Sequence, residues 1–234
     1  MIQKRKTGAT NTLNYAIKIL AVIKKDVQAE YRARYAVNSV LLFCVTSLAV
    51  VSFSLGGTVK DPGIQASLLW VILFFSAMMG LSRAFIKEQD RGTMNTLRLV
   101  CEPGQVFIGK MMMNFILLVV VMLIVTPLFI VLMNIQNIHV GYFASVMVLS
   151  AAGLSAVCTL LSAVVAQARA RGTLFPVLAF PVLIPVFMVA VKATEKAISE
   201  PSPWANSQML VFLGCYAVVS VIGGSYLFEY VFTE

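Results

Sequence analysis

The stretch from Gly104 to Lys110 reads GQVFIGK, which matches the G-x-x-x-x-G-K frame of a phosphate-binding loop. In such a loop the backbone and the lysine hold nucleotide phosphates, and a following Ser or Thr binds magnesium. Met111 occupies that last position, and the stretch runs directly into a long apolar segment instead of lying in a soluble α/β domain. We therefore expect no nucleotide site and no catalytic residue. Gly104 would belong to a turn, and Lys110 would be a basic anchor at a membrane surface.

The composition is that of an integral membrane protein. Of 234 residues, 59% are hydrophobic and 12% are charged, and the mean hydropathy is +0.89. A soluble domain of this length cannot bury so much apolar surface. Apolar runs of roughly 18 residues or more predict an all-α fold with six transmembrane helices. The expected spans are residues 37–55, 64–81, 111–133, 142–166, 173–191 and 209–228. We expect one membrane domain over residues 15–234 and a flexible tail at residues 1–14.

The basic residues alternate between the two sides of this predicted bundle. Fifteen fall in the N-terminal segment, in the loop at 83–110 and in the loop after the fourth span, whereas the opposite side has Lys60, Lys192 and Lys196. The positive-inside rule then places both termini in the cytoplasm. We attribute the net charge of +8 to this topology and not to nucleic-acid binding. The basic start also resembles an organellar transit peptide, and we favour a cytoplasmic tail. The four cysteines predict neither a disulfide framework nor a metal site.

The loop at residues 83–110 is much longer than a connection between two spans requires. Residues 87–99 predict a short helix with Met94 and Leu97 on its apolar side. The residues expected on its polar side and at its bend are Glu88, Asp90, Arg91, Gly92 and Thr93. Two interpretations remain open, a helix lying on the membrane surface or a coupling helix that docks into a cytoplasmic partner.

Residues 15–35 predict a basic amphipathic helix in the membrane interface, with Leu20, Ile23 and Val27 on one face. Its other faces carry charged residues, including Asp26, Glu30, Arg32 and Arg34, of which Glu30 and Arg34 form an i,i+4 pair. This helix either anchors the first span or also contacts a partner.

The spans contain prolines and small residues but no charged residue in their interiors. Pro176, Pro181 and Pro185 interrupt the hydrogen bonding of the fifth span, so we expect that helix to face other helices, as a gate or as a passive kink. Gly223 and Gly224 would allow a neighbouring helix to approach closely. Because an ion- or proton-coupled carrier needs ionisable groups inside the membrane, we expect an external source of energy.

The segment EQDRGTMNTLRLVCEP resembles the cytoplasmic loop of ABC-2 type permeases, which also have six spans and cytoplasmic termini. Within that superfamily the chain is most similar to the haem exporter protein B (CcmB) family. The similarity rests on three stretches: KKDVQAEYRARYAVNSVLLF, SRAFIKEQDRGTMNTLRLV and ARARGTLFPVLAFPVLIPVFMVAV. It covers most of residues 24–228.

This resemblance implies the non-catalytic membrane subunit of an ABC complex for cytochrome c biogenesis in the bacterial inner membrane. ATP would bind a separate CcmA-like ATPase that docks on the loop at 83–110. Further partners would be CcmC-like and CcmD-like membrane proteins, a CcmE-like haem chaperone and a second copy of the chain. Haem as cargo follows from the resemblance alone, with His139 as the candidate iron ligand. The alternatives are an ABC-2 permease for a lipid, drug or polysaccharide, and a non-transporting scaffold that relays ATPase motion.

Overall fold

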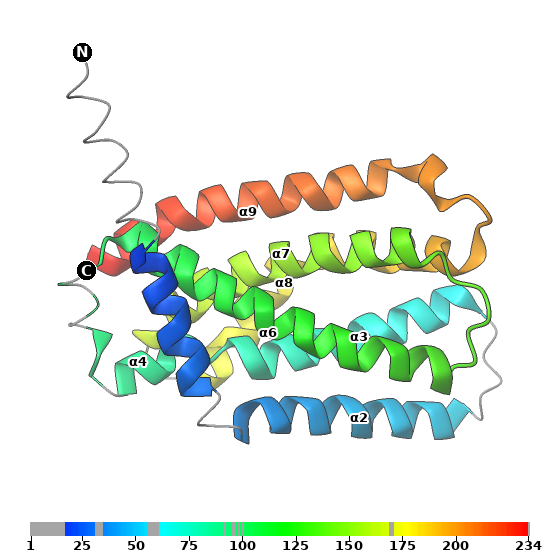
Figure 1. The fold of residues 1–234 in the computed structure, drawn as a ribbon, viewed down its shortest axis with the longest axis horizontal. Coiled ribbons are helices and arrows are strands. Elements are labelled where there is room, and N and C mark those ends of the chain that lie inside the picture. Colours follow the sequence, from blue (N-terminus) through cyan, green and yellow to red (C-terminus); the bar gives the residue numbers. More distant parts are fainter. Residues whose placement is uncertain are drawn as a thin grey trace, which may run out of the picture.

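The computed structural model describes residues 17–30, 35–55, 61–90, 92–94, 97, 99, 101–168 and 171–233. Six long helices run side by side in this part of the chain (Figure 1). They are α2 (Tyr35–Leu55), α3 (Pro62–Leu81), α6 (Pro103–Leu132), α7 (Val140–Ala166), α8 (Arg171–Ser199) and α9 (Gln208–Thr233). Each is long and apolar enough to cross a membrane. The predicted all-α membrane protein with six transmembrane helices is therefore confirmed.

The shorter helical elements include an N-terminal helix at residues 17–30, α4 (Ile86–Asp90) and the 3-10 turn η1 (Pro203–Asn206). Met94, Leu97 and Leu99, which follow α4, are also helical. The N-terminal helix, dark blue in Figure 1, runs across the long helices at the same end of the bundle as α4 and the last turns of α9. We call this the basic end, because it carries Lys25, Arg83 and Lys110, and the opposite end the far end. The tail expected at residues 1–14 lies outside the described residues.

The third span begins eight residues earlier than expected, at Pro103 instead of residue 111. Proline suits the first position of a helix because its missing N–H would be unpaired there. The Gln105 side chain accepts a hydrogen bond from the Glu102 N–H at 3.3 Å, which satisfies another free group at this helix start. The expected turn at Gly104 is thus wrong, and the stretch from Gly104 to Lys110 forms the first two turns of α6.

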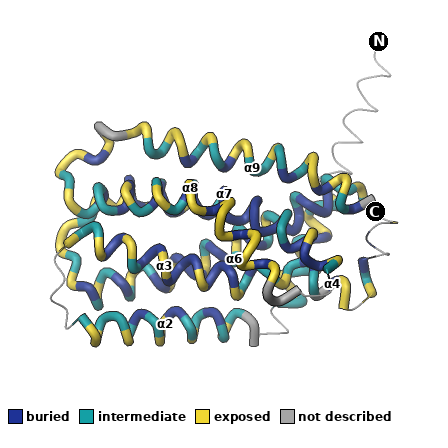
Figure 2. The backbone as a smooth tube through the Cα atoms, turned by 180° about the vertical axis from the view of Figure 1, so that it is seen from behind, coloured by how far each residue is buried: buried dark blue, intermediate teal, exposed yellow. Residues whose placement is uncertain are grey.

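Helix α7 lies at the centre of the bundle and packs against α6, α8 and α9. Small residues on its buried faces, such as Ala151, Gly153 and Ala156, let these helices approach closely. A Cβ atom at Gly153 would lie 3.0 Å from the ring of Tyr216 on α9. The outer helices α2 and α9 are the least buried spans, as the yellow and teal segments of Figure 2 show.

Aromatic side chains join α3 to α8. The Trp70 indole donates a hydrogen bond to the Thr194 hydroxyl at 2.9 Å, and the Phe74 and Phe187 rings meet edge to face at 5.0 Å. Pro176, Pro181 and Pro185 of α8 are all exposed. They do not share one side of the helix, because the nine residues from Pro176 to Pro185 make about two and a half turns. Helix α8 faces other helices, namely α3, α7 and α9, but these helices do not cover its prolines. The packed face of α8 consists of four alanines with Phe175, Leu183 and Val186.

Candidate functional site

Lys110 lies at the end of the second turn of α6 and points into the protein. Its ammonium nitrogen is 2.8 Å from Asp26 Oδ2 and 3.0 Å from Glu88 Oε1, and its side chain is only 5% exposed. It also lies over the Phe85 ring, 5.8 Å from the centroid. The interpretation of Lys110 as a surface anchor is therefore wrong. Two carboxylates from different segments hold it inside, because a buried ammonium must be paired.

Glu88, on α4, is the second centre of this arrangement. Its Oε1 accepts a hydrogen bond from Lys25 at 2.8 Å as well as the one from Lys110, and the Thr93 hydroxyl donates to its other carboxylate oxygen. Burial by itself would raise the pKa of Glu88. The Lys110 charge and the three hydrogen bonds outweigh burial and lower the pKa to about 2. Glu88 is thus a buried carboxylate that stays ionised.

We call Lys25, Asp26, Glu88, Thr93 and Lys110 the ion cluster. It joins three elements, namely the N-terminal helix, the α4 segment and the start of α6. A cavity of about 70 Å³ beside it is also lined by Glu30, Arg83 and Asn114. One turn after Lys110, the Asn114 amide donates to the Thr159 hydroxyl at 2.8 Å, which extends the polar connection to α7.

A second, apolar cluster lies next to these charges at the basic end. Phe228 on α9 contacts the Phe85 and Phe107 rings, with centroids 5.3 and 5.5 Å away. Met94 and Leu97 are buried in the same cluster. We call it the aromatic cluster. Because Leu97 belongs to it, the segment after α4 is held against the bundle by apolar packing as well as by ions.

The N-terminal helix crosses α6 where Gly109 removes a side chain. A Cβ atom at Gly109 would lie 2.9 Å from Val22 Cγ1, a distance that real Cβ atoms do not adopt. The close crossing brings Asp26, one turn after Val22, to Lys110. The second glycine and the lysine of the G-x-x-x-x-G-K frame therefore position a helix and an ion pair.

The α4 helix is shorter than expected because the chain turns at Gly92. Gly92 has a φ of +66°, in the left-handed region that glycine adopts without strain. The Thr93 N–H then bonds the Glu88 carbonyl at 3.0 Å, which closes the turn. Beyond the turn, Leu99 is 88% exposed, and before it Asp90 is exposed. The predicted bend at Gly92 is present and divides the helix expected over residues 87–99: α4 ends at Asp90, and the described residues Met94, Leu97 and Leu99 are again helical.

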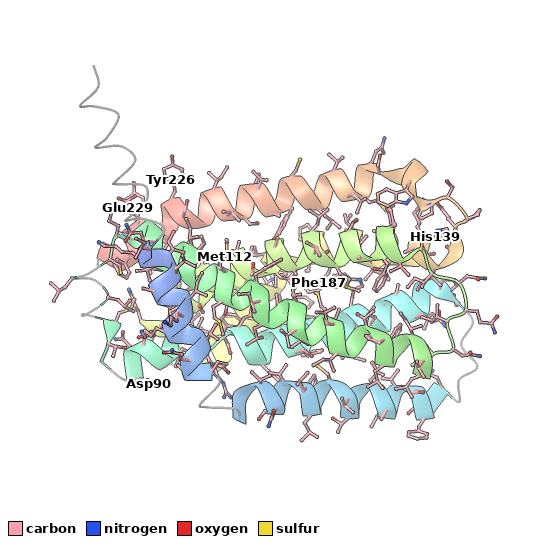
Figure 3. All side chains as sticks on the ribbon, viewed as in Figure 1. Asp90, Met112, His139, Phe187, Tyr226 and Glu229 are labelled. Carbon is pink, nitrogen blue, oxygen red and sulfur yellow. The ribbon has the colours of Figure 1, made fainter. Side chains whose placement is uncertain are left out.

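The structure brings together Asp26, Glu88 and Thr93, and it places Glu30 beside them. Leu97 and Glu88 are buried, contrary to the exposed polar side expected for Glu88. Arg32, Arg34 and Arg91 lie outside the described residues. His139 lies at the far end, directly before α7, and is exposed; Figure 3 shows it at the opposite end of the bundle from Asp90.

Lys25 and the inward position of Lys110 were missed by sequence reasoning. A usable signal was the spacing of Lys110 and Asn114, which puts two polar side chains on one face of an otherwise apolar helix. The described residues contain no group of three or more His, Cys, Asp or Glu side chains that could hold a metal ion. In this arrangement, charged side chains connect the N-terminal helix, the α4 segment and the start of α6.

Comparison with known proteins gives two matches. The family model described as "CcmB protein" matches residues 17–227 of this chain. Heme exporter protein B of Bradyrhizobium diazoefficiens is 20% identical over 183 residues, which cover 77% of this chain and 82% of that protein. The family match includes the N-terminal helix, all of the ion cluster and most of α9.

Proposed function

The chain belongs to the CcmB family, and from this membership we propose that it is the membrane subunit of an ATP-driven complex that handles haem. Its task would be haem export or the release of a haem-loaded chaperone in cytochrome c biogenesis. The name of the Bradyrhizobium relative supports haem as the substrate. We place the protein in the bacterial inner membrane with both termini and the basic end in the cytoplasm, in accord with the positive-inside rule.

The energy would come from a separate ATPase subunit. Among the described residues of the six spans, charged residues lie only near helix ends, namely Lys110, Arg171, Lys192, Glu195, Lys196 and Glu229. A carrier driven by ions or protons needs ionisable groups near the middle of the membrane. The absence of such groups from the described spans favours a motor outside the membrane.

The single observation that carries the coupling proposal is the position of Glu88. This carboxylate stands between the α4 segment and Lys110 of α6, with Lys25 of the N-terminal helix on the same oxygen. A displacement of α4 by a bound ATPase would therefore move two other elements. Buried ion pairs cannot be stretched without a large cost, so they transmit such a displacement stiffly.

The ATPase would contact the exposed residues of the segment and not the buried ones. We propose Asp90 and Leu99 as contacts, with Arg91 beside them in sequence. Gly92 and Thr93 would shape the turn that presents these contacts. Glu88 and Leu97 would act as positioning residues, because both are buried within the protein.

Other parts of the complex would meet other faces. The exposed prolines of α8 leave backbone carbonyls without helical N–H partners, which favours a protein neighbour over lipid. We propose a second copy of the chain as the neighbour along the exposed part of α8. CcmC-like and CcmD-like proteins would be further membrane neighbours. His139, exposed at the far end, would be the ligand for haem iron offered to a CcmE-like chaperone.

A reconstituted complex tests this function. The protein is purified with its ATPase and the other subunits, placed in vesicles and supplied with ATP and haem. Haem movement into the vesicle lumen would support export, whereas ATP-dependent release of the haem-loaded chaperone without movement would support the release function. Neither activity, in a complex that hydrolyses ATP, would refute the proposal and favour a different substrate.

A further inference from the structure

An open apolar groove runs between α6 and α7 on the surface of the bundle. It holds about 290 Å³. Its floor consists of the buried side chains of Met122, Phe143 and Met147, and its rim includes the exposed side chains of Leu123 and Val148. The groove is therefore accessible from the side, from within the membrane.

The lining excludes a polar ligand. Thr126 is the single hydroxyl-bearing residue of the lining, and the other side chains are aliphatic, aromatic or thioether groups. A ligand with charged or hydrogen-bonding atoms would lose its solvation there without compensation. The small side chain of Ala144 and the ring of Pro127 leave the space between the two helices unfilled.

The length of the groove corresponds to one leaflet of a bilayer. On α6 it extends from Val119 to Ile130, which spans about 16 Å at 1.5 Å per residue. Half of a hydrocarbon core about 30 Å thick is about 15 Å. On α7 the lining begins at Val140, the first residue of that helix. The groove thus occupies the leaflet at the far end.

The volume decides which apolar partner fits. Three turns of a helix about 10 Å wide would fill roughly 1,300 Å³, which is several times the space available. A space of 290 Å³ takes on the order of ten methylene groups, if each occupies about the 30 Å³ of a water molecule. The body of a helix from another chain therefore cannot enter the groove and could fill it only with side chains, whereas one extended hydrocarbon chain fits in both length and volume.

We propose that the groove between α6 and α7 binds a single acyl chain of a phospholipid from the far-end leaflet. This lipid site is separate from the ion cluster, which lies at the basic end. The proposal does not depend on haem or on an ATPase, so its outcome is independent of the proposed function.

Photolabelling tests the site in the full-length protein. The protein is reconstituted in vesicles of phosphatidylethanolamine and phosphatidylglycerol that contain a phospholipid with a diazirine in its acyl chain. After irradiation, labelled peptides are mapped by mass spectrometry. We expect labelling of the α6 and α7 lining to exceed that of the exposed α9 face several-fold. The substitution Val148→Phe should reduce it several-fold, whereas Val219→Phe, on the exposed face of α9, should leave it unchanged.

Folding of each variant is checked by its elution as the same species as the unsubstituted protein. If Val148→Phe does not fold, Leu123→Phe on the opposite wall serves in its place, because Leu123 is largely exposed. Equal labelling of the groove and the α9 face would overturn the proposal. So would unchanged groove labelling in the filled variant, or cross-links from the groove to a second copy of the chain.

Discussion

Gly109 on α6 lies directly beneath Val22 of the N-terminal helix, and a Cβ atom at Gly109 would come within 2.9 Å of Val22 Cγ1. The Gly109→Ala substitution should therefore push the N-terminal helix away and weaken the ion pair between Asp26 and Lys110. Valine has little rotamer freedom, so its side chain cannot turn aside cheaply. We expect faster hydrogen exchange in residues 17–30, measured by mass spectrometry. Adding Val22→Ala should restore the space and slow the exchange again. If Val22→Ala does not slow the exchange again, the close contact between Gly109 and Val22 is not the reason for the effect of Gly109→Ala.

Adjacent glycines on α9 provide a matched pair. A Cβ atom at Gly224 would lie 2.6 Å from the tip of the Phe107 ring, whereas one at Gly223 would meet nothing within 4 Å. Phe107 is fully buried in the aromatic cluster and has little room to move. Gly224→Ala should therefore cost about 1–3 kcal/mol of stability, the usual penalty for overpacking. Gly223→Ala should be neutral or gain up to about 1 kcal/mol, because alanine favours a helix. Thermal unfolding in detergent measures both, and equal melting temperatures for the two variants would contradict the prediction.

The Glu88→Gln substitution should destabilise the basic end. It removes the charge that pairs Lys110 and the half-exposed Lys25. Because Asp26 still pairs Lys110, we expect a loss of stability below the roughly 3 kcal/mol that breaking a buried ion pair costs. The exposed neighbour Gln89 offers the control, since Gln89→Ala should change stability by less than about 0.5 kcal/mol. Thermal unfolding and hydrogen exchange of residues 17–30 would detect the difference. The same melting temperature for both variants would mean that Glu88 adds no stability.

The pKa of Glu88 predicts how this contribution depends on pH. The folded-state pKa is about 2, below the ordinary value of 4.5, so the ionised form stabilises the fold. Its contribution is fully present above pH 4.5 and is lost as the pH falls from 4.5 towards 2. We expect a constant gap in melting temperature between the unsubstituted protein and Glu88→Gln from pH 7 to 5, and a narrowing gap below that. A gap in melting temperature that already narrows between pH 7 and 5 would show that the pKa of Glu88 is not lowered in the folded protein.

The sequence predicts the six spans well, because a membrane requires long apolar runs that are visible locally. It does not predict which face of the N-terminal helix meets the protein. Leu20 and Val27 of the apolar stripe expected in the membrane interface are exposed, whereas Val22 and Asp26 pack on α6. In a membrane interface, apolar side chains need not be covered by protein. The ion cluster joins Lys25 to a carboxylate 63 residues away, and no local pattern marks such a pair.

Leu97 and Leu99 lie two residues apart in the segment after α4 and have opposite surroundings. Leu97 is 8% exposed within the aromatic cluster, whereas Leu99 is 88% exposed at the basic end. Leu97→Ala should therefore cost about 2–5 kcal/mol of stability through lost packing. Leu99→Ala should leave stability within about 0.5 kcal/mol but weaken binding of the ATPase subunit by about 1–2 kcal/mol, if Leu99 anchors that contact. Melting temperature measures the first effect, and the amount of ATPase that co-purifies with the tagged protein measures the second.

Asp90→Asn tests the same surface independently. Unchanged co-purification with both Leu99→Ala and Asp90→Asn would show that neither of these exposed side chains contributes to the contact with the ATPase.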